Sequence, residues 1–331
     1  MQSLQENIRK NRLQCPIEDP DRNLFFSLVD YRNNLFTSND PKKIIEFYNG
    51  FENRDQLIEW MRERPKGASY IHEVEGDKDI VVVIPTADFN GKYAKECREN
   101  IFKGLHIIFV ESGGREDFYF NYAHNCNLGI KKAMEYNPKW IVLSNDDMYK
   151  IDDVNVLVRQ LKNINEENYN AVFTKSARYH SAPCRIMKIN SFYNLFNLVT
   201  NYNAGRIRIK LYKKFNVEFT SMRSKYALIF SFPRKSYPFT ESLDFLILSR
   251  KFVEQAMGNI FDETYVNGGE DVDLSLRISF AREKIAFINY KIGDYMGSTL
   301  GLSNQRWIRD IAGHCYFDFK WRNRLQKIIP S

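Results

Sequence analysis

IVVVIP, residues 80–85, is a continuous run of apolar, mostly β-branched side chains, and it decides the fold class. A strand that is hydrophobic at every position is typical of a parallel sheet covered by helices on both faces. A charged helical stretch, KYAKECRENIFKG, follows it, and a second apolar strand is expected over 105–110. NYAHNCNLGIKKAMEYNP then predicts a helix ended by an Asn-Pro pair, before a third strand over 139–143. This alternation predicts a doubly wound α/β layer.

Polar side chains follow each of these three strands. In such sheets ligands bind at the carboxyl ends of the strands. Those ends carry Thr86, Asp88, Glu111, Asn145, Asp146 and Asp147. Carboxylates at a strand end can hold Mg²⁺ or Mn²⁺, which favour oxygen ligands and commonly share them with substrate phosphates. Asn and Asp also cap helices and fill turns, so the NDD triplet by itself has a structural explanation too.

A second acidic group lies in the segment NGGEDVDLSLR, which carries Glu270, Asp271 and Asp273 within four positions. Apolar residues recur every four positions, which predicts an amphipathic helix over 270–283. Acids are favoured in a first helical turn by ~0.3–1 kcal/mol each, and Asp273 can pair with Arg277 one turn later. In one open sheet, this helix start and the acidic turn after the third strand would converge on a single cleft.

Composition narrows the class of protein. The 331 residues are 44% hydrophobic and 27% charged, which is typical of a globular chain. No apolar run approaches the ~20 residues of a membrane helix, and the polar first residues lack the apolar core of a signal peptide. The five cysteines are scattered without a CxxC pair, which indicates reduced thiols and argues against a zinc cluster. A cytoplasmic protein is expected.

Several common catalytic signatures are missing from the sequence. There is no GxGxxG and no GxxxxGK[ST] phosphate loop. GSTLG has Thr299 where the GxSxG nucleophile of a serine hydrolase requires Ser, so that class is disfavoured. Nucleotidyltransferases on a similar sheet usually carry a Gly-rich loop after the first strand, and PTADFNGKY does not resemble one.

Three regions are expected along the chain. Residues 1–75 are predicted to be a helical extension with a packing or docking role, with helix caps at Asp40 and at Asn53 or Asp55. Residues 76–184 would form the α/β half with the three predicted strands. Residues 185–331 would form a second half that contains the basic segment 185–235.

The segment 185–235 concentrates the positive charge of the chain. It contains eleven Lys or Arg and one acid, Glu218, so it carries +10 while the whole chain carries +7. Within it, RIRIKLYKKF alternates apolar and basic residues, a pattern typical of a strand. Such a segment could meet anionic lipid, a lipid-phosphate acceptor or nucleic acid, or be a solvated face. Peripheral contact with a membrane is therefore one expectation.

From about Asp79 to Asn323 the chain resembles the family 2 glycosyltransferases of the GT-A fold. The resemblance rests on the order and spacing of five segments: IVVVIPT, IIFVESGG, NCNLGIKKA, VLSNDDM and FDETYVNGGEDVDLSLR. It implies a Rossmann-like, mainly parallel central sheet flanked by helices. It also implies inverting, metal-assisted transfer of a sugar from a UDP-, GDP- or dTDP-linked donor to a glycan or lipid-linked acceptor. On this resemblance, residues 76–184 would be the nucleotide-sugar-binding half and residues 185–331 the acceptor-binding and catalytic half.

The resemblance also implies roles for individual residues. Asn145 and Asp147 would bind Mn²⁺ or Mg²⁺, and Asp271, next to Glu270, would be the general base. The nucleotide would contact Pro85, Thr86, Asp88, Glu111, Asn127 and Asp146. A helix start lowers the pKa of Asp271, whereas neighbouring acids raise it, so the sequence leaves the sign of the sum open.

One departure and two alternatives remain. Many relatives place a His shortly after the acidic segment, but here the next one is His314, which leaves its metal-binding role open. The alternatives are a nucleotidyltransferase, or a non-enzymatic protein that binds nucleic acid or a membrane surface on an inactive scaffold. Nucleic acid is the partner that the sequence favours least.

Overall fold

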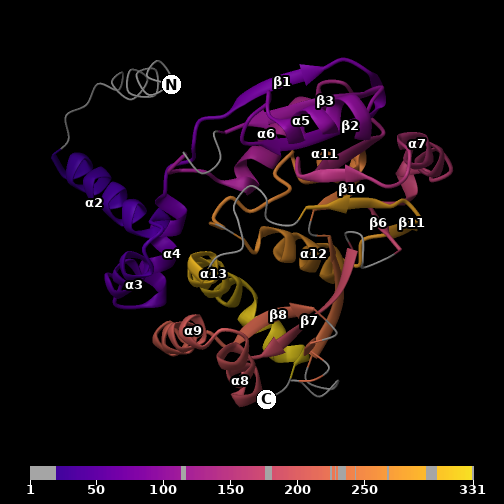
Figure 1. Ribbon diagram of the computed structural model, residues 1–331. Coiled ribbons are helices and arrows are strands. Elements are labelled where there is room, and N and C mark those ends of the chain that lie inside the picture. Colours follow the sequence, from indigo (N-terminus) through magenta and orange to yellow (C-terminus); the bar gives the residue numbers. More distant parts are fainter. Residues whose placement is uncertain are drawn as a thin grey trace.

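The computed structural model describes residues 20–112, 117–175, 181–223, 226–227, 229, 236–242, 244–266, 268–295 and 304–329. Thr299 and residues 1–19 of the predicted extension lie outside this part of the chain. The described part is an α/β structure built on a seven-stranded sheet with helices on both faces (Figure 1).

The order of the central strands is β1 (Tyr70–Val74), β3 (Leu105–Glu111), β2 (Asp77–Thr86), β4 (Trp140–Ser144), β10 (Phe245–Ser249), β6 (Ala171–Thr174) and β11 (Ile285–Ile288). β2 pairs in parallel with β3 and β4, and β6 pairs in parallel with β11. β10 runs antiparallel to β4 and β6, and β1 runs antiparallel to β3. The α/β prediction is confirmed, but the sheet is mixed rather than mainly parallel. The reason is that β10 follows β9 of a smaller sheet and starts beside the last residue of β4, so it runs back along β4 in the opposite direction.

The hydrophobic strand β2 fixes both layers of the core. Ile80, Val82 and Ile84 face α5 (Lys92–Glu96), the π-helical turn η1 (Cys97–Ile101) and α7 (Val154–Lys162). Val81 and Val83 face α6 (Tyr122–Met134), α11 (Arg250–Gln255) and α12 (Glu270–Ala281). All five side chains are buried because successive residues of a strand point to opposite faces.

A second part of the molecule is built on a three-stranded antiparallel sheet of β8 (Phe219–Arg223), β7 (Ser181–Lys188) and β9 (Ser236–Ser242). The helices α8 (Ser191–Thr200) and α9 (Tyr202–Lys214) connect β7 to β8, and α13 (Asn304–Ile328) packs against α9 and β8 (Figure 1). Two smaller elements are also described: a strand pair of β12 (Ile292–Asp294) with β5 (Met148–Lys150), and a 3₁₀ turn, η3 (Glu166–Asn168).

The strand-like pattern of RIRIKLYKKF led to a wrong prediction, because this segment lies in the helix α9. Asn201 caps the helix by accepting a hydrogen bond from the Ala204 amide. The residues that α9 buries, among them Arg208 and Leu211, follow a helical spacing, while Arg206 is exposed. Alternation over a few residues is compatible with both structures, and packing against α13 selects the helix.

Three N-terminal helices pack on the C-terminal helix. They are α2 (Pro20–Thr37), α3 (Pro41–Asn49), capped by Asp40, and α4 (Arg54–Glu63), capped by Asn53 rather than Asp55. Arg309 of α13 donates hydrogen bonds to the carbonyl oxygens at the end of α2, namely those of Phe36, Thr37 and Ser38. None of the described helices is long and apolar enough to cross a membrane.

The buried hydroxyl of Tyr48 joins α3 to α13. Its oxygen lies 2.9 Å from the carbonyl oxygens of Ile308 and Arg309 and accepts a hydrogen bond from the Ala312 amide at 3.1 Å. The Tyr48 ring is fully buried, so water cannot replace these partners. A buried polar group that loses its partner costs about 1–3 kcal/mol.

We therefore expect Tyr48→Phe to lower the free energy of unfolding by about 1–3 kcal/mol in urea titrations. Tyr31→Phe is the matched control, because the Tyr31 hydroxyl donates to Glu46 on the exposed side of the same helices. That change should stay within about 0.5 kcal/mol of the unmodified protein. Equal effects of the two substitutions would show that the contact with α13 contributes nothing to stability.

Candidate functional site

The acidic turn after β4 lies against the end of β2. Thr86 donates a hydrogen bond from Oγ1 to Oδ2 of Asp146 at 2.7 Å, and the Cys97 thiol donates to the Asp146 carbonyl oxygen at 3.3 Å. Asp146 and Asp147 are both buried. Burial raises the pKa of Asp146 to about 6, with a further rise from Asp147, although the Thr86 hydrogen bond opposes it. The predicted residues at the ends of β2 and β4 thus lie together.

Asn145 connects this turn to the start of β10. Its Oδ1 accepts a hydrogen bond from the Tyr122 hydroxyl at 2.9 Å, and its Nδ2 donates to Asp244 Oδ1 at 3.1 Å. The Asn145 amide also donates to the Asp244 carbonyl oxygen at 3.0 Å. The side chain predicted to bind a metal is therefore used to place Asp244 beside the turn.

Two glycines and a close helix contact set the start of α12. Gly268 and Gly269 have φ values of 130° and 104°, in the left-handed region that favours glycine. A Cβ atom on Gly313 of α13 would lie 2.3 Å from the Gly268 carbonyl oxygen, so the two backbones touch. This contact holds the first turn of α12, with Glu270 and Asp271, at a defined place.

Asp273 has a different role from its two acidic neighbours. It is fully buried, and Arg277, Lys320 and Trp321 each place a nitrogen 2.9 Å from its carboxylate. The Tyr265 hydroxyl lies 3.3 Å away. We name this group of five residues the Asp273 clamp. A buried carboxylate with this many donors holds α12 on α13 and is not available for proton transfer from a substrate.

The turn at 145–147 and the start of α12 both lie near Asp244, which is hydrogen-bonded to Asn145. Burial raises the pKa of Asp244 to about 7, and the next causes are the charges of Asp294, Asp271 and Asp147. Burial is the main cause of the high pKa of Tyr122, and the charges of Glu270 and Asp244 raise it further. Tyr122 therefore lies near both of these carboxyl groups. We name this group the acidic cluster: Asp146, Asp147, Glu241, Asp244, Glu270, Asp271 and Asp294.

Glu241 of β9 is the member of the acidic cluster that has a buried carboxylate oxygen without a hydrogen-bond partner in the described part of the chain. That oxygen is Oε2, and the residue as a whole is buried. Burial raises its pKa to about 8, Asp271 raises it further, and Cys184 and Arg223 oppose the shift. Sequence reasoning missed Glu241, Asp244 and Asp294. The signal for the first two was the acid pair in YPFTESLDF, immediately before a buried strand.

The first turn of α12 contains two neighbouring carboxyl groups, those of Glu270 and Asp271. Burial raises the pKa of Glu270 to about 8, followed by the charge of Asp271. Burial also raises the pKa of Asp271, and it outweighs the Val272 amide, which donates to Oδ1 at 2.8 Å, and the charges of Arg306 and Arg223. The sign that the sequence left open is therefore upward.

The donor set of the acidic cluster suits a hard divalent cation. Within the described ranges, no group of three or more His, Cys, Asp or Glu side chains is arranged to hold a metal ion by itself. Mg²⁺ and Mn²⁺ nevertheless commonly take only one or two protein carboxylates and complete their shell with substrate phosphates. The charges of Asp294 and Asp147 raise the pKa of Asp244, and a cation bound beside Asp244 would relieve that repulsion.

The other residues predicted at the strand ends form a neighbouring group. Glu111 accepts a hydrogen bond from the Phe89 amide at 3.2 Å, and one of its oxygens lies 2.6 Å from His72 Nε2. The rings of His72 and Phe89 stack with centroids 4.3 Å apart. Asp88 is exposed and accepts from the Asn90 amide, and Pro85 is buried at the end of β2.

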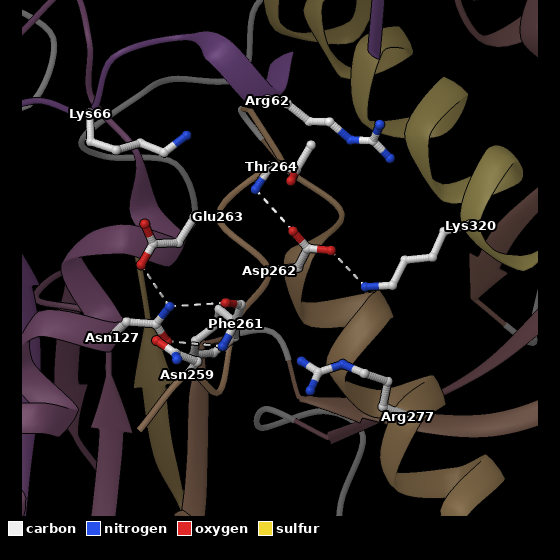
Figure 2. A pocket seen from close by; sticks show the side chains of 10 residues that line it. All are labelled: Arg62, Lys66, Asn127, Asn259, Phe261, Asp262, Glu263, Thr264, Arg277 and Lys320. Atoms are coloured by element: carbon white, nitrogen blue, oxygen red, sulfur yellow. Dashed lines mark hydrogen bonds and ion pairs between the residues drawn. The ribbon is translucent and has the colours of Figure 1, made fainter. Parts of the chain in front are cut away.

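Asn127 belongs to a second site, a hollow of about 440 Å³ (Figure 2). The hollow is lined by Arg62, Lys66, Asn127, Asn259, Phe261, Asp262, Glu263, Thr264, Arg277 and Lys320. The amide of Asn127 donates to the Phe261 carbonyl oxygen and to Glu263, each at 2.9 Å, and accepts from the Phe261 amide. Burial would raise the pKa of Asp262, but Lys320 and its other donors lower it to about 2.

This hollow shares no residue with the acidic cluster, and many of its polar groups bond to one another. The FDE segment at 261–263 is thereby tied to α6 and α13, which holds the chain that leads into α12. His314 lies apart from both sites among the contacts of α9, with Nδ1 2.8 Å from the Tyr212 hydroxyl. Burial lowers its pKa to about 3, with a further effect of Arg208, so the imidazole is neutral.

Neither the protein-family models nor the curated proteins contain a match to this sequence. The function is therefore inferred from the geometry and charge of the acidic cluster. Three features of the acidic cluster support this inference: carboxylates at two strand ends, a charged helix start near Asp244, and pKa values raised mainly by burial.

The raised pKa values predict that the free energy of unfolding depends on pH. A carboxyl group whose pKa is higher in the folded state binds more protons there, so stability falls as the pH rises from its ordinary value towards the raised one. We expect Glu241→Gln to increase the free energy of unfolding by about 1–3 kcal/mol at pH 8.5, and by less at pH 5. Glu59→Gln, at an exposed position of α4, should change it little at either pH. Urea titrations at both pH values measure the difference, and a destabilised Glu241→Gln at pH 8.5 would contradict the prediction.

Proposed function

We propose that this protein is an inverting glycosyltransferase of the GT-A type, which moves a sugar from a nucleotide-diphosphate donor to an acceptor hydroxyl. The observation that carries the proposal is the meeting of the turn at 145–147 with the start of α12 around Asp244. Such a transfer needs carboxylates for a diphosphate-bound cation and, opposite them, a base for the acceptor. The acidic cluster offers both sets in one place.

Asp271 is the proposed general base. It lies at a half-buried helix start, its charge acts on Asp244 beside the turn, and burial raises its pKa. A base works best when its pKa lies near the working pH, and burial moves Asp271 in that direction. Asp271 would take the proton of the acceptor hydroxyl as the oxygen attacks the anomeric carbon, while Glu270 keeps its own proton.

Asp147 is the proposed main metal ligand, with Asp244 and Asp294 beside it. Mn²⁺ or Mg²⁺, when bound, neutralises the charge that develops on the leaving diphosphate. No general acid is then required on the donor side. Asp146 orients the turn through its hydrogen bond with Thr86, and Asn145 positions Asp244, so their roles are structural support for the ligands.

The nucleotide would lie along the ends of β2 and β3. Thr86, Glu111 and the stacked pair of His72 and Phe89 form a polar and aromatic edge there, with Pro85 and Asp88 next to it. Aromatic faces stack on bases and carboxylates accept from their N–H groups. Asn127 is assigned a different role, because its amide is used to hold the segment that precedes α12.

Asp271→Asn tests the base. We expect transfer to fall by about 10²–10⁴-fold, because a general base contributes that much, while binding of the donor in the presence of Mn²⁺ is unchanged. The control is Asp55→Asn, at an exposed site on α4, which should keep full activity. Turnover by Asp271→Asn at the rate of the unmodified protein would refute the assignment.

A thermal-shift panel of UDP-, GDP- and dTDP-linked sugars, with and without Mn²⁺, tests the donor site. A ligand that binds only the folded state raises the melting temperature with its occupancy. We expect one donor class to do so in the presence of Mn²⁺ and Asp147→Asn to abolish the effect. If no nucleotide sugar binds, and polynucleotides bind with steep salt dependence, the non-enzymatic alternative is favoured instead.

A further inference from the structure

The helix α8 has its apolar side turned outward. Phe192, Leu195 and Val199 follow the spacing of one helix face, and they are 61%, 52% and 76% exposed. Its buried residues are Tyr193 and Asn197, one helical turn apart. None of its ten residues, SFYNLFNLVT, is charged. In a helix that served only to stabilise the fold, the apolar face would be the buried one.

The close contact between α8 and α9 explains the orientation. A Cβ atom on Gly205 would lie 2.3 Å from the Asn197 carbonyl oxygen, so the backbones of the two helices touch there. The side chain of Asn197 donates to the Tyr193 carbonyl oxygen at 3.2 Å and stays within its own helix. The close approach leaves no room for a large side chain at position 205, and Phe192, Leu195 and Val199 of α8 lie on the outer side.

Other exposed apolar residues extend this surface. Tyr202 at the start of α9 is exposed, and so is Tyr226, which follows β8. The Tyr226 ring lies 5.7 Å from that of Phe196, which places Tyr226 against α8. We name the set the outer apolar face: Phe192, Leu195, Val199, Tyr202 and Tyr226. Apolar residues gathered in this way mark interaction sites more often than chance.

A line of cations borders the outer apolar face. Arg206, Lys210 and Lys213 follow Tyr202 at helical spacing on α9, and all three are exposed. The Arg206 guanidinium lies 5.6 Å from the centre of the Tyr202 ring, which joins the two surfaces. The whole segment 185–235 carries +10. Apolar side chains next to Lys and Arg are the composition of helices that lie in the interface of an anionic bilayer.

We propose that α8 and α9 dock this protein on the surface of an anionic lipid bilayer. The outer apolar face enters the boundary between head groups and acyl chains, and the cations of α9 contact the phosphates. Figure 1 shows both helices beside the three-stranded sheet, at the end of the molecule away from the central sheet. Glu241 lies at the other end of that small sheet, because it pairs with Ala182 at the start of β7, whereas α8 follows the end of β7. The proposal is independent of the transferase proposal, since lipid binding needs no donor.

Flotation of the full-length protein with vesicles tests the proposal. We expect binding to phosphatidylcholine vesicles with 30% phosphatidylglycerol, and at least tenfold weaker binding to phosphatidylcholine alone. Leu195→Gln with Val199→Gln should weaken binding about tenfold, and Arg206→Gln with Lys210→Gln and Lys213→Gln should do so on anionic vesicles only. The controls are Met257→Asn, at an exposed apolar residue elsewhere, and Lys42→Gln with Lys43→Gln and Lys103→Gln, which remove as much charge. Both controls should bind like the unmodified protein.

A second measurement does not depend on removing the surface. Phe192→Trp places a fluorophore on the outer apolar face, and its emission should shift to the blue with anionic vesicles and not with neutral ones. Three results would overturn the proposal: equal binding to both kinds of vesicle, equal loss in the control variants, or no shift at position 192. Association of the protein with itself, or with polynucleotides, that the Leu195 and Val199 changes abolish while vesicle binding is absent would also overturn it.

Discussion

The Asp273 clamp is the interaction on which the rest of the candidate site depends. A carboxylate without solvent contact is held by Arg277, Lys320 and Trp321, and through them α12 is fixed to α13. Removing one partner of a buried ion pair typically costs about 3–5 kcal/mol, because the other charge is left without compensation. The clamp also engages Asp273, the one acid of the EDVD sequence that is fully buried. Glu270 and Asp271, which precede it by three and two positions, are thereby held at the start of the helix, near Asp244.

The acidic cluster represents the opposite case. Its carboxyl groups are close together and partly or fully buried, and the net effect of their surroundings is to raise the pKa values of Asp146, Glu241, Asp244 and Glu270. Such an arrangement works against folding at neutral pH, since ionised groups would be better solvated in the unfolded chain. Carboxyl groups with raised pKa values often gather at binding and catalytic sites, and in the proposed function a divalent cation would supply the missing positive charge.

The two sheets of the molecule divide these tasks. The central sheet provides the strand ends with Thr86, Glu111 and the turn at 145–147, and the small sheet contributes Glu241 through β9. β10 connects them, because it starts next to Ser144 and runs back through the centre of the large sheet. The same small sheet carries α8 and α9. A surface that would meet lipid and a cluster that would meet an activated sugar are therefore built on one framework, which suits an acceptor held at a membrane.

Local sequence determined the elements, and tertiary structure decided which of them meet. The hydrophobic run 80–85, the helix caps and the acidic strand ends could be recognised because periodicity and capping act over a few residues. The direction of β10 could not, since an apolar strand reads the same in both directions, and so Asp244 and Glu241 stayed hidden. The pairing of Asp273 with Arg277 was expected from their spacing in one helix and is confirmed. The helical state of RIRIKLYKKF and the contacts of Asp273 with Lys320 and Trp321 depended on α13, far along the chain. Burial and long-range charge, which only the folded chain brings about, also decided that the pKa of Asp271 rises.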